Sequence, residues 1–259
     1  MKIAITGKGG TGKTTVAAVL SHFFLKDGYQ VLAVDADPDA NLAAALGASE
    51  KERTSITPIS SQRKLIQERT GAKPRQFGQL FKLNPTVKDI PDSFGISIRG
   101  IKLLVMGSIA GGGEGCACPE NVLLKSLLSE IILRRKEVIV VDMEAGIEHL
   151  GRATAASIDI MIIVVEPGKR SVETAETILK MAGQIGISNF GILGNKIQGQ
   201  NQEEWIQHQF PPQLYLGGIS YSTIFGQSDM AGKPLMDMLD DLAEKEFRAI
   251  YSSLRLDKI

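Results

Sequence analysis

Residues Gly7 to Thr15 read GKGGTGKTT, a spacing of glycine, lysine and threonine that suits the binding of a nucleotide's phosphates. In such a loop, successive backbone N–H groups surround the phosphates. The Lys13 ammonium would reach the β- and γ-phosphates, and the Thr14 hydroxyl would coordinate Mg²⁺. The sequence therefore predicts a phosphate-binding loop whose ligand-contacting residues are Gly9, Gly10, Thr11, Gly12, Lys13, Thr14 and Thr15.

The residues on either side of this loop have the patterns of a strand and a helix. Lys2 to Ile5 form a short apolar run, which fits a buried parallel strand. After the loop, apolar side chains recur at helical spacing until Gly28, which supplies a stop signal; they are Val16, Val19, Leu20, Phe23 and Phe24. This context argues against a glycine turn without a ligand.

The rest of the chain alternates between strand and helix patterns. Apolar runs predict strands at residues 31–34, 136–141, 160–165 and 190–193, and helical patterns follow at about 171–185 and near 236–254. Such alternation predicts an α/β fold: a doubly wound, mainly parallel sheet with helices on both faces, as in P-loop NTPases. A chain of 259 residues fits one such domain, residues 1–259.

One basic segment departs from this pattern. Between Ser60 and Lys88 the chain has seven basic residues and a single acidic one, together with two prolines and two glycines. We interpret it as part of an insertion on the core at about residues 50–98. A solvated face is the favoured role, and a docking surface for an acidic partner is the alternative.

Acidic residues follow three of the predicted strands, at the edge where open α/β sheets bind their ligands, and those after two of the strands are assigned roles here. Asp142 comes directly after an apolar run and is the candidate to hold Mg²⁺, often through water. Gly146, four residues later, could sense the γ-phosphate through its N–H. Asp37 is the candidate to orient the attacking water, while Asp35 is assigned a supporting role.

The pair Asn195-Lys196 bears on which base the site would bind. It resembles the start of the guanine-selecting NKxD motif, but Gln198 stands where that motif requires an acid. Asn195 could instead bridge the N6 donor and N7 acceptor of adenine. We therefore expect ATP as the nucleotide, with Asn195 and Lys196 in its binding site.

Composition excludes several other classes of function. The chain has 29 basic and 29 acidic residues, a balance that does not suggest a nucleic acid or an anionic membrane as a partner. The first predicted strand begins at Lys2, so we expect no signal peptide before it. The longest apolar stretch falls far short of the ~20 residues of a membrane helix. We expect a cytoplasmic protein.

The two cysteines lie together in a glycine-rich stretch, residues 111–119. Pro119 suits a first helical position, so Cys118 would sit at a helix N-terminus, where the dipole favours the thiolate. Cys116 and Cys118 offer two soft ligands, too few for a closed metal site. Two chains related by a two-fold axis would offer four, enough for tetrahedral Zn²⁺ or square-planar Ni²⁺.

The phosphate loop, with Lys8 after its first glycine, resembles the deviant KGGxGKTT loop of the MinD/ParA/nitrogenase-iron-protein class of dimeric ATPases. This resemblance implies a homodimer in which Lys8 crosses the interface and touches the partner's ATP. It also assigns the water-orienting role to the Asp of the DP step, here Asp37-Pro38.

Over nearly its full length the chain resembles the CooC family of ATPases, which assist nickel insertion into carbon monoxide dehydrogenase. The resemblance is carried by the phosphate loop, by the cysteine motif followed by a helix, and by the segments VDADPD (34–39), AGIEHL (145–150) and VEP (165–167). It implies an ATP-dependent nickel chaperone with Mg²⁺ as cofactor. Its client would be apo carbon monoxide dehydrogenase or the related acetyl-CoA synthase. Glu144 departs from the family pattern, where a small or neutral residue is usual.

A second class of function stays open at this point. Four thiolates from a dimer could also bridge a [4Fe–4S] cluster, as in an iron–sulfur carrier or a reductase resembling the nitrogenase iron protein. The short C-x-C spacing matches neither of those groups. His149 is a possible nickel ligand as well, but a local hydrogen-bonding role is favoured because the sequence has no second histidine near it.

Overall fold

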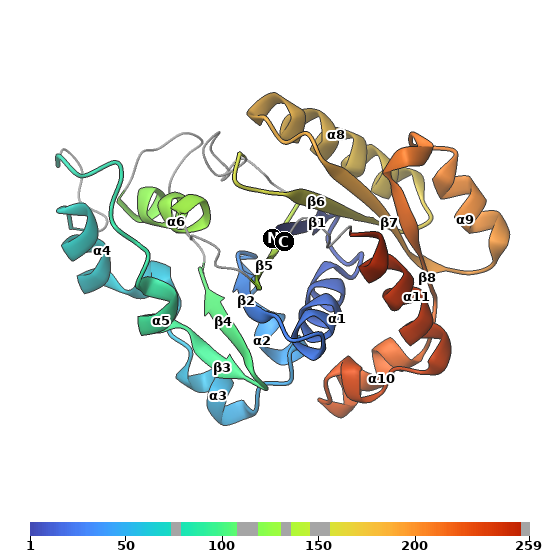
Figure 1. The fold of residues 1–259 in the computed structure, drawn as a ribbon, viewed down its shortest axis with the longest axis horizontal. Helices are drawn as coiled ribbons and strands as arrows, with labels where there is room; N and C mark the ends of the chain where they lie inside the picture. The colour runs from blue at the N-terminus through green and yellow to red at the C-terminus, as the bar shows by residue number, and fades with distance from the viewer. Residues whose placement is uncertain (74–78, 108–118, 131–135, 146–155, 255–259) are drawn as a thin grey trace.

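The computed structural model describes residues 1–73, 79–107, 119–130, 136–145 and 156–254. In these residues, eight strands form one sheet in the order β3-β4-β2-β5-β1-β6-β7-β8 (Figure 1). All neighbouring strands run parallel except β3 and β4, which form an antiparallel edge. The strands are β1 (Lys2–Gly7), β2 (Gln30–Asp35), β3 (Ile96–Ile98), β4 (Ile101–Val105), β5 (Glu137–Asp142), β6 (Ile160–Val165), β7 (Phe190–Ile197) and β8 (Tyr215–Ser220).

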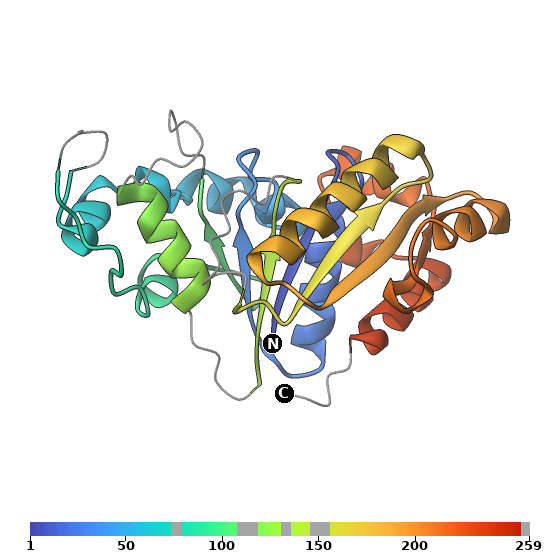
Figure 2. The same cartoon turned by 90° about the horizontal axis from the view of Figure 1, so that it is seen from above.

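Helices cover both faces of this sheet (Figure 2). Successive side chains of a strand point to opposite faces, and the apolar side chains therefore divide into two cores, one on each side. One core packs against α4 (Arg63–Thr70), α5 (Ile90–Phe94), α6 (Pro119–Glu130), α8 (Lys169–Ile185) and α9 (Gln200–Gln207). The other packs against α1 (Lys13–Lys26), α2 (Leu42–Ala45) and α11 (Asp241–Ser253). The predicted doubly wound α/β fold is confirmed.

The central strands are fully buried. Every residue of β1 and of β6 is buried, as expected for parallel strands with helices on both sides. Because β1 lies between β5 and β6, the loop after β1 comes out at the carboxyl edge of the sheet, between the ends of its neighbours.

Three strands and one helix differ from the sequence prediction. The sequence prediction lacks the two edge strands, β3 and the glycine-containing β8, and also lacks β4, which pairs with β3. The helix predicted near 236–254 begins later, because residues 235–237 form a short 3-10 turn, η3. Helix α11 starts only after Asp240, whose carboxylate accepts a hydrogen bond from the Ala243 N–H at 2.8 Å and caps the helix.

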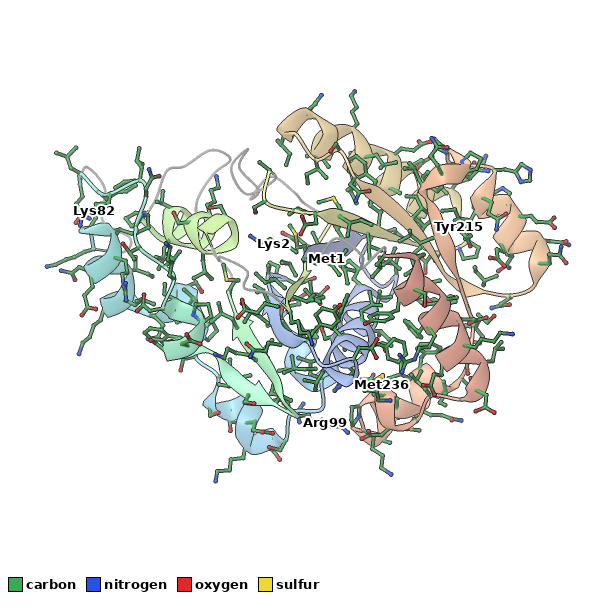
Figure 3. All side chains as sticks on the ribbon, in the orientation of Figure 1. Met1, Lys2, Lys82, Arg99, Tyr215 and Met236 are labelled. Atoms are coloured by element: carbon green, nitrogen blue, oxygen red, sulfur yellow. The ribbon has the colours of Figure 1, made fainter. Side chains whose placement is uncertain are left out.

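The described residues of the basic segment and its surroundings pack on the core of the fold. Residues 50–98 contain α3 (Glu50–Ser55), the 3-10 turn η1 (Ile59–Ser61), α4, α5 and β3. Helix α4 packs on α6, and Leu65, Ile66 and Ile90 join the first core. Lys82 lies beside α4 at one end of the molecule (Figure 3). Whether this segment is an insertion on a single domain stays a prediction.

An ion pair connects the turn between β3 and β4 to the C-terminal part of the chain. Arg99, in the turn between β3 and β4, donates two hydrogen bonds of 3.0 and 2.6 Å to the Asp237 carboxylate. Figure 3 labels Arg99 and Met236, the residue before Asp237, close to each other. This ion pair connects the turn to η3.

Within the described residues, no helix combines the length and the apolar character needed to cross a bilayer.

Candidate functional site

The phosphate loop connects β1 to α1 and places the N-terminus of α1 at the carboxyl edge of the sheet. The helix begins at Lys13, its N-cap is Gly12, and no side chain caps its first turn or adds an acid there. The free N–H groups and the helix dipole at such an end attract anions. The geometry therefore suits a phosphate group.

Two glycines of the loop are required by their backbone and their neighbours. Gly7 has φ +145°, and a Cβ there would lie 2.4 Å from the Val164 carbonyl oxygen of β6. Gly12 has φ +97°, and a Cβ there would lie 2.4 Å from the Asn195 amide nitrogen. Larger residues at either position would displace the loop from the strands that support it.

Lys13 and the two predicted acids come from different elements and meet at this edge. The Lys13 side chain is buried, and its Nζ lies 3.9 Å from an oxygen of Asp37, after β2. Asp35, the last residue of β2, accepts hydrogen bonds from the backbone N–H groups of Leu42 at 2.9 Å and Asp37 at 3.3 Å. Asp35 thus shapes the loop that carries Asp37, which agrees with the supporting role expected for it.

Asp142, at the end of β5, is fully buried. Neither of its carboxylate oxygens has a partner of ordinary hydrogen-bond geometry among the described residues. Burial raises the pKa of Asp142 to about 7, although the nearby Thr14 hydroxyl and the Lys13 charge partly oppose this change. Burial also raises the pKa of Asp35 to about 6. An unpaired buried carboxylate is costly, and a cation is the partner that would relieve the cost.

These residues fit Mg²⁺. The Asp142 carboxylate and the Thr14 hydroxyl are hard oxygen ligands, the kind that Mg²⁺ prefers. Among the described residues, no group of three or more His, Cys, Asp or Glu side chains is arranged to hold a metal. Phosphate oxygens and water would complete the coordination, as is usual for Mg²⁺ bound with a nucleotide.

Asn195 and Lys196, near the end of β7, both contact the phosphate loop. The Asn195 amide donates to the Thr11 carbonyl at 2.7 Å, and its oxygen accepts from the Lys196 N–H at 2.9 Å. The Lys196 Nζ donates to the Gly10 carbonyl at 2.6 Å. In this arrangement the Asn195 amide braces the loop, whereas its contact with a base stays a prediction.

The two roles of Asn195 can be separated by measuring nucleotide selectivity. Asn195→Ala removes the hydrogen bond to Thr11, so we expect the affinity for ATP to fall by about 5- to 30-fold, the effect of about 1–2 kcal/mol. If bracing is its role, affinity for GTP falls by the same factor. A loss confined to ATP would instead place Asn195 on adenine. Gln198→Ala, on the exposed residue three positions later, is the matched control, and binding of both nucleotides is measured by calorimetry.

The structure adds one residue that the sequence analysis did not place in the site, Glu166. It follows β6 and lies near both Lys8 and Lys196, at 3.7 and 3.3 Å. The signal available in the sequence is the place of Glu166 directly after the apolar run at residues 160–165. Gly146, Cys116, Cys118 and His149 lie outside the described residues.

Comparisons with known proteins agree with this geometry. The model of the CobQ/CobB/MinD/ParA nucleotide binding domain matches residues 2–235. The septum site-determining protein MinD of Pyrococcus horikoshii, solved with Mg-ADP, has a TM-score of 0.70 at 18% identity, with 100% of this chain and 98% of that chain covered. At that identity the similarity concerns the fold.

Two relatives are much more similar in sequence. An ATP-binding protein of Methanocaldococcus jannaschii is 46% identical over 97% of this chain and 96% of its own length. The carbon monoxide dehydrogenase accessory protein CooC of Rhodospirillum rubrum is 42% identical over 92% of this chain and 90% of its own. Together with the phosphate loop, these matches identify the chain as an ATPase of the CobQ/CobB/MinD/ParA nucleotide-binding family, within its CooC-like group.

Proposed function

We propose that this ATPase is a nickel chaperone that matures carbon monoxide dehydrogenase, or the related acetyl-CoA synthase, in the cytoplasm. The observation that carries the proposal is the 42% identity with the CooC accessory protein along nearly the whole of both chains. The sequence adds Cys116 and Cys118 in a glycine-rich C-x-C motif, which supplies soft ligands for the cargo metal.

In the proposed reaction, the chain's own residues bind and orient the nucleotide. The α1 N-terminus and Lys13 hold the phosphates, while Thr14 and Asp142 hold Mg²⁺, which neutralises charge on the phosphates when bound. Asp37 orients the water that attacks the γ-phosphate, and the Gly146 N–H senses that phosphate. The 3.9 Å between Lys13 and Asp37 supports the assignment, because it places the aspartate beside the phosphate-binding lysine.

The working unit in this proposal is a homodimer. Lys8 of each chain reaches the nucleotide of the partner, and the two C-x-C motifs together give four thiolates for one metal ion. Nickel is the cargo, with zinc as a competitor because thiolates bind both. The nucleotide state controls whether the two chains hold the metal or pass it to the client.

The test is an anaerobic Ni²⁺ titration, read by elemental analysis and light scattering with and without ATP. We expect one nickel per dimer in the wild-type protein and none in the Cys116→Ala/Cys118→Ala double variant, because its thiolates are gone. ATP binding should be unchanged in that variant, which checks the fold. His208→Ala removes an exposed imidazole and should keep the nickel.

Other results would contradict this assignment. If nickel stoichiometry survived in the double cysteine variant, the metal site would lie elsewhere. A brown dimer that carries iron and sulfide would favour the iron–sulfur alternative, in which the same four thiolates bridge a cluster. Transfer is measured last, as nickel-dependent recovery of activity in apo carbon monoxide dehydrogenase.

A further inference from the structure

Glu166 occupies a fixed position at the edge of the phosphate loop. It is the first residue after β6, and its N–H donates to the hydroxyl of Ser171, which is buried in the first turns of α8, at 3.1 Å. The main chain is therefore held both by the strand and by the helix that follows. The side chain of Glu166 remains 27% exposed, so its carboxylate is accessible to the ammonium groups of nearby lysines.

The carboxylate of Glu166 is shared between two lysines. One oxygen lies 3.7 Å from the Lys8 Nζ and the other 3.3 Å from the Lys196 Nζ. Lys8 belongs to the phosphate loop and Lys196 to β7, the strand next to β6. The Glu166 side chain thus connects the phosphate loop to β7.

The two lysines are held to different degrees. Lys196 has φ +58°, a left-handed backbone that is uncommon outside glycine, and its ammonium also donates to the Gly10 carbonyl at 2.6 Å. For the Lys8 ammonium, Glu166 is the one ion-pair partner within the part of the chain that the structure describes. Lys8 can therefore leave Glu166 without disturbing Lys196.

We propose that Glu166 is a positioning residue that holds Lys8 on its own chain and yields it to a competing phosphate. The proposal rests on the proposed function, in which Lys8 must reach the partner's nucleotide. When Lys8 leaves, Glu166 keeps its contact with Lys196, so no carboxylate is left unpaired. The hold of Glu166 on Lys8 then sets how readily two ATP-bound chains associate.

The contact itself can be measured without any dimer. Lys8 acetylation by an amine-reactive ester is followed by mass spectrometry, at a protein concentration low enough to keep the chain monomeric. We expect Glu166→Gln to raise the Lys8 labelling rate about two- to five-fold, the range expected of a partly exposed ion pair. Glu166→Asp, which keeps the charge, should lie closer to wild type. Glu176→Gln, which removes an exposed charge from α8, should change nothing.

The effect of this contact on dimer formation is measured as the dissociation constant of the dimer with ATP, by analytical ultracentrifugation. A symmetric dimer breaks two Lys8–Glu166 contacts, so the effects multiply. Glu166→Gln should therefore tighten the dimer about 4- to 25-fold, the square of the single-contact effect. In a Lys8→Ala background the same change should have no effect, because the effect acts through Lys8.

Three results separate the possible failures. An unchanged Lys8 labelling rate in Glu166→Gln would overturn the proposal. So would a tighter dimer in the Lys8→Ala background, because Glu166 would then act through another group. A wild-type chain that stays monomeric with ATP would refute the homodimer of the proposed function, while the labelling result would still decide whether Glu166 holds Lys8.

Discussion

Asp142→Asn is expected to raise the melting temperature of the protein in EDTA at pH 8 by about 5–10 °C, although it removes a residue of the site. The reason is that Asp142 is fully buried and neither of its carboxylate oxygens has a partner of ordinary hydrogen-bond geometry among the described residues, so its charged form destabilises the fold. Asparagine has nearly the same shape without the charge. The gain corresponds to about 2–4 kcal/mol, from about 1.4 kcal/mol per unit of pKa shift.

The pH dependence has a definite sign. The pKa of Asp142 is about 7 in the folded protein against 3.8 for an ordinary aspartate. The folded chain thus binds this proton more tightly than the unfolded chain, and the free energy of unfolding falls as the pH rises from about 4 to about 7. The advantage of Asp142→Asn should therefore be full above pH 7 and vanish towards pH 4.

Thermal melts of both proteins between pH 4 and pH 8 test this expectation. Asp39→Asn is the matched control, because it removes an exposed carboxylate near the same site and should leave the pH profile unchanged. Melting curves of wild type and Asp142→Asn that differ by a constant amount at every pH would contradict the burial argument. If Asp142 holds Mg²⁺ as proposed, Mg²⁺-dependent ATP turnover of the variant should fall at least about 100-fold, because that carboxylate is lost.

Lys8→Ala should reduce ATP turnover by about 10³-fold if Lys8 reaches the partner's ATP as proposed, because this is the lower range for a cationic side chain supplied by a partner to a phosphoryl transfer. The affinity of a single chain for ATP should change less than two-fold, because Lys13 and the α1 N-terminus remain. Lys180→Ala, an exposed lysine of α8, is the matched control. Phosphate release and nucleotide binding measure the two quantities separately.

Mixing two inactive variants shows on which chain Lys8 acts. Lys13→Ala lacks its own phosphate lysine but keeps Lys8, while Lys8→Ala has the opposite defect. If Lys8 acts on the partner's ATP, mixed dimers contain one complete site, and a 1:1 mixture recovers up to about a quarter of wild-type turnover. No recovery, with both variants folded, would mean that Lys8 works within its own chain.

The sequence predicted the core of the fold because its strong signals are local. Apolar runs such as 160–165 have no polar residue to confuse the pattern, and the observed β6 has the same limits. The strands that were missed depend on tertiary contacts. β8 contains Gly217 and Gly218, which weaken a strand pattern, and β3 is only three residues long.

In the site, too, the sequence predicts the residues that have a local signal and misses the contacts that depend on tertiary structure. Lys13, Asp37 and Asp142 were singled out because each follows a strand or lies in the phosphate loop, and parallel strands bring those ends together. The contacts of Glu166 could not be foreseen, because they depend on which strand lies beside β1 and on side-chain directions there. The bracing of Thr11 by Asn195 joins residues 184 positions apart, beyond any local pattern.

The position of β1 has a consequence for the synthesis of the protein. The N-terminal ammonium of Met1 donates to the Glu137 carbonyl, and β1 pairs with β5 on one side and β6 on the other. β1 is synthesised before both of its partner strands and therefore waits for residues 137–165 before either edge is paired. Such distant pairing slows folding and leaves the apolar residues Ile3, Ala4 and Ile5 of β1 exposed in the meantime. The element that carries the phosphate loop thus needs protection from aggregation in the growing chain.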